Sequence, residues 1–495
     1  MSIFKTIQGN KQRKTAFNLS HDKKLSMRMG DLVPILCEEV VPGDSWNIRT
    51  QSFIRLAPMI APVMHSVDAY IHYFFVPNRL LNGAWEKFIT GDSSAALPTL
   101  GEEEIIKGGL GDFLGLPPMT AEQTDNQNIS LFPFQAYTLI YNEYYRDQNL
   151  QDEIDITDQA EIIELRKRAW EKDYFTSALP WTQKGAEGVL PFDTTVTYKD
   201  PSFFVQSTVP EDSARTLNTS AFNAADDQYH NRIRNSAGTE GYIDNVESIE
   251  GQITINEFRI AHRIQKWFER QARAGSRYTE TLLSHFGTHT GDARLQRPEY
   301  LGGGKQPVVM SEVLQTSESA TTPQGTMSGH GISVGNTAKA HQVFKEHGYI
   351  LAILSVMPKP AYQQGIHKSW LRQDKFDYYW PEFAHLGEQA VLNKELYLQH
   401  NAGDLDTFGY QSRYAEYKYK APSVHGDMRT SLAFWHMGRI FSAAPSLNEA
   451  FIRMDGSSIN ARVFAAGDAA DQLWVQIHHS IIARRPMPYY ATPTI

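Results

Sequence analysis

Apolar residues alternate with polar ones, or run together, in a series of short segments that predict β-strands. Three of these segments lie near the start of the chain, at Leu32–Val41, Trp46–Leu56 and Val63–Val76. In the third, every second residue from Val63 to Phe75 falls on one mostly apolar face, and Pro77 ends the run because it cannot donate to a sheet ladder. Further strands are predicted at Tyr349–Met357, Ala415–Tyr419, Ser431–His436, Ala450–Met454 and Leu473–Ile482.

A helical period appears in fewer places. The aromatic residues of Phe134–Gln148 are spaced for one helix face, and Asp158–Lys172 predicts a second helix. The clearest helix follows Thr254-Ile255-Asn256-Glu257, a pattern typical of a capping box, and ends at Ala274-Gly275. Its predicted apolar stripe consists of Phe258, Ala261, Ile264, Phe268 and Ala272.

Long stretches between these elements lack clear periodicity. Residues 92–130 are loop-like, residues 186–255 are rich in Ser, Thr, Asn and Asp, and residues 287–345 are predicted to be loop-rich. A compact domain seldom contains an irregular stretch as long as 186–255 unless that stretch has its own role. The 34 Gly and 24 Pro residues are scattered without a period, which indicates many turns. The patterns therefore predict a mainly β protein with long inter-strand insertions that carry a few helices.

The net charge of −9 is unevenly distributed along the chain. Residues 186–255 carry eleven acids and four bases, whereas residues 1–30 carry seven bases and one acid. The seven bases are Lys5, Lys11, Arg13, Lys14, Lys23, Lys24 and Arg28. We predict that 1–30 is a basic, extended N-terminal arm that faces a different environment from the acidic middle of the chain.

Cysteine content and apolar runs favour a protein made in a reducing cytoplasm. Cys37 is the single cysteine, so no internal disulfide can form. The first residues lack the apolar stretch of a signal peptide. The longest apolar run, Tyr349–Met357, is too short to cross a bilayer.

Several patterns resemble active sites but lack the context that the chemistry needs. Gly302-Gly303-Gly304-Lys305 lacks the spacing of a phosphate loop, and we interpret it as a flexible turn. Gly331-Ile332-Ser333-Val334-Gly335 follows polar sequence rather than a buried strand, which favours a Gly/Ser-rich loop over a nucleophile elbow. His285, His289 and Asp292 favour a surface or interface pair over a metal site. We therefore predict no catalytic, cofactor-binding or metal-binding residue, and no enzyme.

Aromatic residues next to Arg or Lys are frequent, as in 376–380 and 410–419. Such mixtures occur at protein–protein interfaces, on stacking platforms for single-stranded nucleic acid, and in sugar-binding sites. The alternative hypothesis is therefore an all-β carbohydrate-binding or carbohydrate-active protein. A carbohydrate-active enzyme would need two carboxylates facing a cleft, and no motif predicts them.

Eight longer motifs in one order give a more specific indication. They are Arg55–His65, Tyr70–Leu81, Tyr141–Asp147, Asp173–Trp181, Gly275–Tyr278, Asp292–Gly303, Asp377–Pro381 and Arg485–Tyr490. Together they closely resemble the major capsid protein of Microviridae, particularly its gokushovirus-like branch of single-stranded DNA bacteriophages. The resemblance covers nearly the whole chain outside 92–130 and 186–255.

The resemblance implies a fold, a set of partners and a location. The fold would be one eight-stranded antiparallel jelly roll, residues 31–495, with long inter-strand insertions. The subunits would assemble through pentamers into a T=1 icosahedral shell around circular single-stranded DNA. The bases of the arm 1–30 would then neutralise DNA phosphates inside the shell, and an arm that threads onto a neighbouring subunit is an equally good interpretation. Other virion proteins would be further partners, and 186–255 is the candidate for an outer-surface protrusion that contacts a host receptor. The protein would be assembled in the host bacterial cytoplasm and reside in the virion.

Overall fold

The structure is a computed structural model that divides into two compact units. Unit 1 comprises Met1–Thr182 and Gln271–Ile495, and unit 2 comprises Gln183–Arg270. The described residues are 13–91, 96–185, 193–198, 216–223, 228–234, 240–241, 246–252, 255–275, 277–318, 323–337 and 339–490, with only the backbone described between 193 and 252. The arm 1–30 and the single domain 31–495 stay predictions as divisions of the chain.

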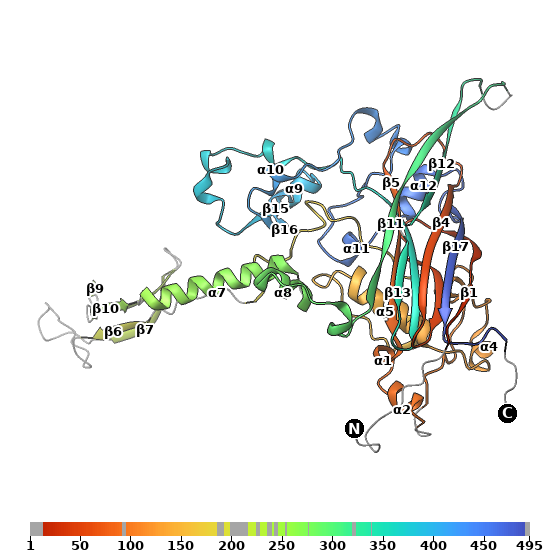
Figure 1. The fold of residues 1–495 in the computed structure, drawn as a ribbon. Helices are drawn as coiled ribbons and strands as arrows, with labels where there is room; N and C mark the ends of the chain where they lie inside the picture. Colours follow the sequence, from red (N-terminus) through yellow and green to blue (C-terminus); the bar gives the residue numbers. More distant parts are fainter. Residues whose placement is uncertain are drawn as a thin grey trace, which may run out of the picture. The chain divides into compact units, whose positions relative to one another are not determined.

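Unit 1 is built on one antiparallel sheet of ten strands that curls on itself (Figure 1). The strands are β1 Thr15–Asn18, β2 His21–Met27, β3 Val33–Val40, β4 Ser45–Leu56, β5 Val67–Pro77, β11 Glu299–Leu314, β12 Met327–Asn336, β13 Ala340–Val343, β14 Gly348–Pro358 and β17 Leu473–Arg485. The continuous order is β1-β17-β4-β12-β11-β5-β14-β3, while β2 also pairs with β17 and β13 with β4. The mainly β, antiparallel jelly-roll fold is thus confirmed.

The strand β11 joins two halves of this sheet. Its residues Glu299–Val308 pair with β5, and its residues Val309–Leu314 pair with β12. We call β5, β14 and β3 the covered half, and β12, β4, β17 and β2 the open half. The inner faces of both halves share one core, which includes Trp46, Tyr73 and Ile477.

The covered half is buried on both faces. Its outer face packs against helix α5 (Phe132–Ile140) and the π-helical turn η1 (Tyr141–Tyr145). The insertion 96–130 adds α3 (Leu110–Leu114) to this cover and also contains α4 (Ala121–Asp125). Residues of the outer cluster include Phe74, Val76, Leu351, Ile353, Leu110, Phe134 and Tyr137. Strands buried on both faces explain the continuous apolar run at Tyr349–Met357.

The open half follows strict alternation. In β4 the buried residues Ile54 and Leu56 alternate with exposed ones, and β17 alternates in the same way over its whole length. One face of these strands therefore completes the core, and the other faces away from it.

A third apolar cluster, which contains Phe175, Tyr362 and Phe408, lies around the hairpin of β15 (Glu388–Leu392) and β16 (Thr407–Ser412). Short α-helices connect the strands of unit 1: α1 Asn78–Leu81, α2 Trp85–Ile89, α6 Gln159–Ile162, α8 Tyr278–Phe286, α9 Asn393–Leu396, α10 Ala415–Lys418, α11 Glu449–Ile452 and α12 Ser457–Val463. Single 3₁₀ turns lie at Asp292–Leu295, Lys368–Trp370, Lys375–Asp377, Pro381–Phe383, Ala402–Leu405, Gly426–Arg429 and Ala433–Trp435.

Unit 2 combines strands with most of the long helix α7 (Ile255–Ala274). Strand β6 (Asp193–Tyr198) pairs with β10 (Val246–Gln252), and β7 (Thr216–Asn223), β8 (Gln228–Arg234) and β9 (Glu240–Gly241) form a second sheet. The stretch predicted to be irregular thus contains strands. Helix α7 ends at Gly275 as predicted, where φ is +98°. The predicted cap residue Thr254 lies outside the described residues. Phe258 and Ile264 of the predicted stripe are 56% and 45% exposed.

Three short predicted strands and one long predicted helix are wrong. Ala415–Tyr419 and Ala450–Met454 are helical turns, and Ser431–His436 contains a 3₁₀ turn. Asn448 favours the helical turn at 449–452 because its side chain accepts a hydrogen bond from the Phe451 N–H. The helix predicted at Asp158–Lys172 stops after one turn, since the backbone of 166–170 bonds instead to Gly30, Leu32 and Ile452.

The loop-rich prediction for 287–345 is also wrong, because β11, β12 and β13 occupy most of it. Glycine is present here for close packing of neighbouring backbones. A Cβ at Gly303 would lie 2.4 Å from the Ile71 carbonyl oxygen, and a Cβ at Gly329 would lie 2.5 Å from that of Ala61. The glycines therefore mark crowded strands rather than turns.

Candidate nucleic-acid interface

The predicted basic residues of the arm divide into exposed and engaged side chains. Lys5 and Lys11 lie outside the described residues. Arg13, Lys14 and Lys24 are exposed, and Lys14 donates a hydrogen bond to the Gly43 carbonyl oxygen.

Lys23 and Arg28 are engaged within unit 1. The Lys23 ammonium donates to the carbonyl oxygens of Pro34 (3.2 Å) and Phe113 (2.5 Å), and burial lowers its pKa. Arg28 forms ion pairs with Asp468 at 3.6 Å and with Asp471 at 3.7 Å. These two bases hold the sheet to its surroundings, so the structure does not group all the predicted site residues on one surface.

Pairing of β2 with β17 explains why neighbouring lysines differ. Successive residues of a strand point to opposite faces, so Lys23 points inward while Lys24 points outward. Lys24 lies opposite Gln476 of β17, which in turn lies opposite Phe53 of β4. The outward row therefore crosses three strands of the open half.

The outward face of the open half carries bases and aromatic rings in adjacent rows. One row contains Lys24, Gln476, Phe53 and Val334, and the next contains Ser26, Trp474, Arg55 and Ile332. Phe53 is 41% exposed and Trp474 is 47% exposed. The exposed bases Arg49 and Arg484 extend the same face along β4 and β17. We call this surface, defined by Lys24, Arg49, Phe53, Arg55, Trp474 and Arg484, the basic sheet face.

The basic sheet face has little negative charge. Among the described exposed residues of β2, β4 and β17, Asp22 is the only acid, and it is 2.6 Å from the His478 Nδ1 atom. Arg49, Arg55 and Arg484 were not among the predicted site residues. The signal was in the sequence, since Arg49 and Arg55 occupy the outward positions of the predicted strand Trp46–Leu56.

A buried polar network lies beneath this face and ties four strands together, β17, β4, β3 and β5. The imidazole of His479 contacts the Thr50 hydroxyl at 2.9 Å and the Ile35 carbonyl oxygen at 3.1 Å. Thr50 also accepts a hydrogen bond from the Tyr73 hydroxyl. Burial lowers the pKa of His479 to about 4, so the ring is neutral at physiological pH. His478 and His479 point to opposite faces of β17.

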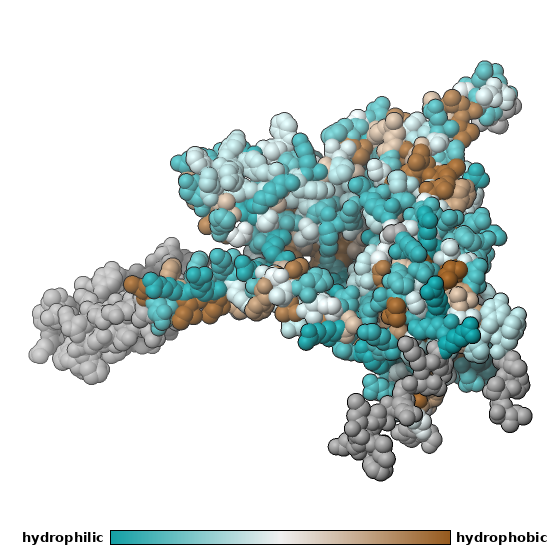
Figure 2. Space-filling view, viewed as in Figure 1, coloured by the Kyte–Doolittle hydropathy of each residue, from teal (hydrophilic) through white to brown (hydrophobic). Residues whose placement is uncertain are grey.

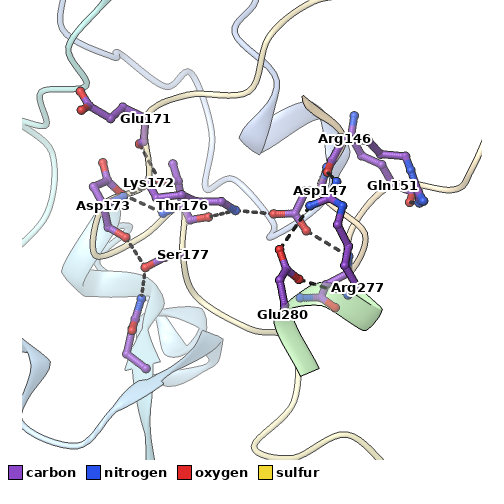
Figure 3. A network of polar contacts seen from close by, with 12 residues as sticks. Arg146, Asp147, Gln151, Glu171, Lys172, Asp173, Thr176, Ser177, Arg277 and Glu280 are labelled. Carbon is purple, nitrogen blue, oxygen red and sulfur yellow. Dashed lines mark hydrogen bonds and ion pairs between the residues drawn. The ribbon is translucent and has the colours of Figure 1, made fainter. Parts of the chain in front are cut away.

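Several of the motifs that carried the resemblance meet in a polar cluster of unit 1 (Figure 3). Arg277 donates to the carbonyl oxygens of Asn142 (3.2 Å) and Arg146 (3.0 Å). Asp147 pairs with Lys172, whose ammonium also donates to the Thr176 carbonyl oxygen. The motifs at 141–147, 173–181 and 275–278 therefore join separate segments of the chain, which is a structural role.

The patterns that resembled active sites lie in strands or in ion pairs. Ser333 is 1% exposed in β12 and donates to the Pro307 carbonyl oxygen, so it is not presented as a nucleophile. Lys305 lies in β11 and pairs with Asp68 at 2.8 Å. Both segments are strands, so the loop and turn interpretations of them are corrected. Asp292 is paired with Arg297, and the described residues contain no group of three His, Cys, Asp or Glu that could hold a metal ion.

A cavity of about 520 Å³ lies near the third apolar cluster and is lined by two carboxylates, Glu395 and Glu416. The Tyr174 hydroxyl donates to Glu395 at 2.9 Å, and the Gln389 amide donates to Glu416 at 2.6 Å. Each carboxylate thus already has a partner within the fold. Within the described part of the chain, no helix has the length and apolar character needed to cross a membrane.

Comparison with known proteins identifies the family of the chain. The family profile described as capsid protein (F protein) matches residues 5–495. Capsid protein VP1 of Bdellovibrio phage phiMH2K is 36% identical, covering 97% of this chain and 95% of the relative. Capsid protein VP1 of Chlamydia phage 1 is 33% identical (97% and 95%), and that of Spiroplasma virus 4 is 31% identical (99% and 97%). The chain therefore belongs to the phage F capsid protein family, and its role is that of a structural major capsid protein.

Proposed function

We propose that this capsid protein assembles through pentamers into a T=1 icosahedral shell that encloses circular single-stranded DNA, with the basic sheet face turned toward the DNA. The family membership supports assembly into a shell. The observation that carries the DNA contact is the combination of exposed arginines and exposed aromatic rings on one face of a rigid sheet. The shell would form in the host bacterial cytoplasm and, with other virion proteins, become the virion.

The chemistry of the face suits a single strand without sequence preference. Arg49, Arg55 and Lys24 would neutralise phosphates, and the released counterions favour binding. Phe53 and Trp474 would stack on bases, which contributes about 1–3 kcal/mol per base. Because every base has an aromatic face, such a surface accepts any genome sequence.

The arm would add to this contact on the same side. Arg13 and Lys14 precede β1, which pairs with β17 next to Arg484. These two bases would extend the positive charge of the basic sheet face; Lys5 and Lys11, for which we propose the same role, lie outside the described residues. Lys23 and Arg28 would instead support the sheet through the bonds described above.

Replacing Lys24, Arg49 and Arg55 by Gln tests the DNA contact. Particles of this variant should form in normal yield but contain less DNA, measured by the absorbance ratio at 260 and 280 nm. For isolated pentamers, loss of three phosphate contacts should reduce the salt dependence of single-stranded DNA binding by about two in the log–log slope.

The control replaces the exposed lysines Lys87, Lys107 and Lys420 by Gln, because they change the net charge equally outside the basic sheet face. Unchanged DNA content in the first variant, or an equal loss in both, would contradict the proposed contact.

For unit 2 we propose an outer-surface protrusion that contacts the host. Its support is the acidic composition of 186–255 together with exposed apolar residues of α7, which include Ile260 (51%) and Trp267 (50%). Deletion of roughly 205–248 should leave the shell intact and impair adsorption to cells. Loss of folding in that deletion would place the segment in the core instead.

A further inference from the structure

The β11–β12 hairpin continues past the ends of its neighbouring strands (Figure 1). Pairing of β12 with β4 starts at Ile332, and among the described residues the bridge of Met59 with Gly329 is the backbone pairing of the hairpin with another segment that lies farthest along it. Beyond it, Glu312–Leu314 pair with Met327–Gly329 of the same hairpin. A two-stranded hairpin of this kind is marginally stable in water by itself.

Apolar side chains are exposed along the hairpin on both of its faces: Val309 and Val313 lie on one face, and the paired Leu314 and Met327 lie on the other. Val309 is 63% exposed, Val313 is 50% exposed, Leu314 is 48% exposed and Met327 is 44% exposed. Figure 2 shows hydrophobic surface on the hairpin and near its base. Exposed apolar side chains gathered on one hairpin in this way mark an interaction site.

Val309 lies opposite Ile332, which lies opposite Arg55, so one face of the hairpin continues the outward face of the open half. Charge distinguishes the hairpin surface from the basic sheet face. Between Lys305 and Lys339 the sequence contains no Lys or Arg, and its only acids are Glu312 and Glu318. A surface without bases has no means of neutralising phosphates. Apolar surface depleted of charge is instead typical of the centre of a protein–protein contact.

We propose that the β11–β12 hairpin is an intersubunit arm whose apolar side chains, Val309, Val313, Leu314 and Met327, pack against a second copy of this chain. The partner is a second copy because the chain belongs to a family of capsid proteins, in which contacts between subunits build the shell. The free edges of the hairpin add unpaired backbone groups that a neighbouring subunit can satisfy. The inference rests on the proposed assembly into a shell, and it assigns a contact between subunits to the β11–β12 hairpin.

The test is the double variant Val309→Glu and Val313→Glu in the full chain. Both side chains are at least half exposed, and the two residues lie four positions apart on the same face of β11. Folding should therefore be preserved. We expect a melting temperature close to that of the wild type and at least tenfold fewer shells at equal protein concentration, measured by sedimentation and electron microscopy. The matched control is Ile89→Glu with Ile106→Glu, which are 48% and 58% exposed on the insertions of the covered half.

A wild-type yield of shells from the double variant would overturn the inference. Loss of the folded subunit would also overturn it, since these side chains would then belong to the subunit's own core. The variant Lys24→Gln, Arg49→Gln, Arg55→Gln keeps the two proposals distinct: it should lose DNA and keep shells, whereas the hairpin variant should lose shells.

A direct readout comes from a fluorophore at position 313. Cys37 is the only natural cysteine, and burial raises the pKa of its thiol to about 12, so Val313→Cys can be labelled selectively. On assembly of labelled subunits, emission should shift to the blue as the dye becomes covered. Unchanged emission in assembled shells would overturn the inference.

Discussion

The two halves of the sheet share one core but differ on their outer faces. In the covered half, β14 is buried at all but one of its positions from Gly348 to Pro358, because helices and the insertion 96–130 pack on the second face. In the open half, β17 alternates between buried and exposed residues from Leu473 to Ala483. The difference teaches that the pattern of apolar and polar residues along a strand shows whether one face or both faces of its sheet are covered. It also identifies the outward face of the open half as the surface that is available to a binding partner.

The largest expected difference between the halves is in the free energy of unfolding that is lost when one aromatic ring is removed from each. Phe74 of β5 is 1% exposed and packs against Tyr144 with ring centroids 4.8 Å apart, whereas Phe53 of β4 is 41% exposed. Phe74→Ala should lower the free energy of unfolding by about 3–5 kcal/mol, and Phe53→Ala by less than about 1 kcal/mol. Urea unfolding of isolated subunits measures both. Equal losses would remove the distinction between the halves.

A smaller effect of acid should be common to both halves, since each contains a buried neutral histidine. Burial lowers the pKa of His72 in β5 and of His479 in β17 to about 4, against 6.5 for an exposed histidine. The burial of each neutral imidazole ring stabilises the folded state above pH 6.5, and this stabilising contribution is lost as the pH falls from 6.5 toward 4. The loss is about 3 kcal/mol for each ring at most.

His479→Gln tests this pH dependence for the open half. Glutamine can still bond to Thr50 or Ile35 but does not titrate, so unfolding measured between pH 7 and pH 4 should depend less steeply on pH than in the wild type. An unchanged slope would show that His479 does not contribute to acid sensitivity.

The smallest expected effect concerns the binding of single-stranded DNA to the basic sheet face. Trp474→Ala should weaken binding of pentamers to single-stranded DNA by about 1–3 kcal/mol, and by the same amount for different sequences, because stacking is sequence-tolerant. The control Trp370→Ala removes a ring that is 83% exposed and lies outside the basic sheet face. Fluorescence titration at fixed salt measures both, and equal weakening would indicate non-specific damage.

Most of the long strands could be predicted because burial imposes a clear pattern on them. Trp46–Leu56 and Leu473–Ile482 alternate, and Tyr349–Met357 is continuously apolar, so β4, β17 and β14 were predicted close to their observed bounds. The four-residue helical turns at 415–418 and 449–452 were not predicted. A segment this short contains too few apolar residues to distinguish the pattern of a helix from that of a strand.

Other features depend on neighbours that the sequence does not reveal. Gly303 and Gly329 resemble turn residues, and only the close approach of Ile71 and Ala61 explains their place in strands. Lys23 and Lys24 have the same chemistry, and only the pairing of β2 with β17 separates a buried side chain from an exposed one. The bases Arg49 and Arg55 lay in a predicted strand, but the curvature of the sheet was needed to show that their face is uncovered.

The central claim is that the basic sheet face contacts the packaged DNA. A cryo-electron microscopy reconstruction of DNA-filled particles, compared with empty ones, tests it most directly. The account predicts that the basic sheet face lines the interior and that DNA-filled particles alone have additional density against Phe53, Arg55 and Trp474. A basic sheet face on the exterior, or one covered by a neighbouring subunit in both kinds of particle, would contradict it.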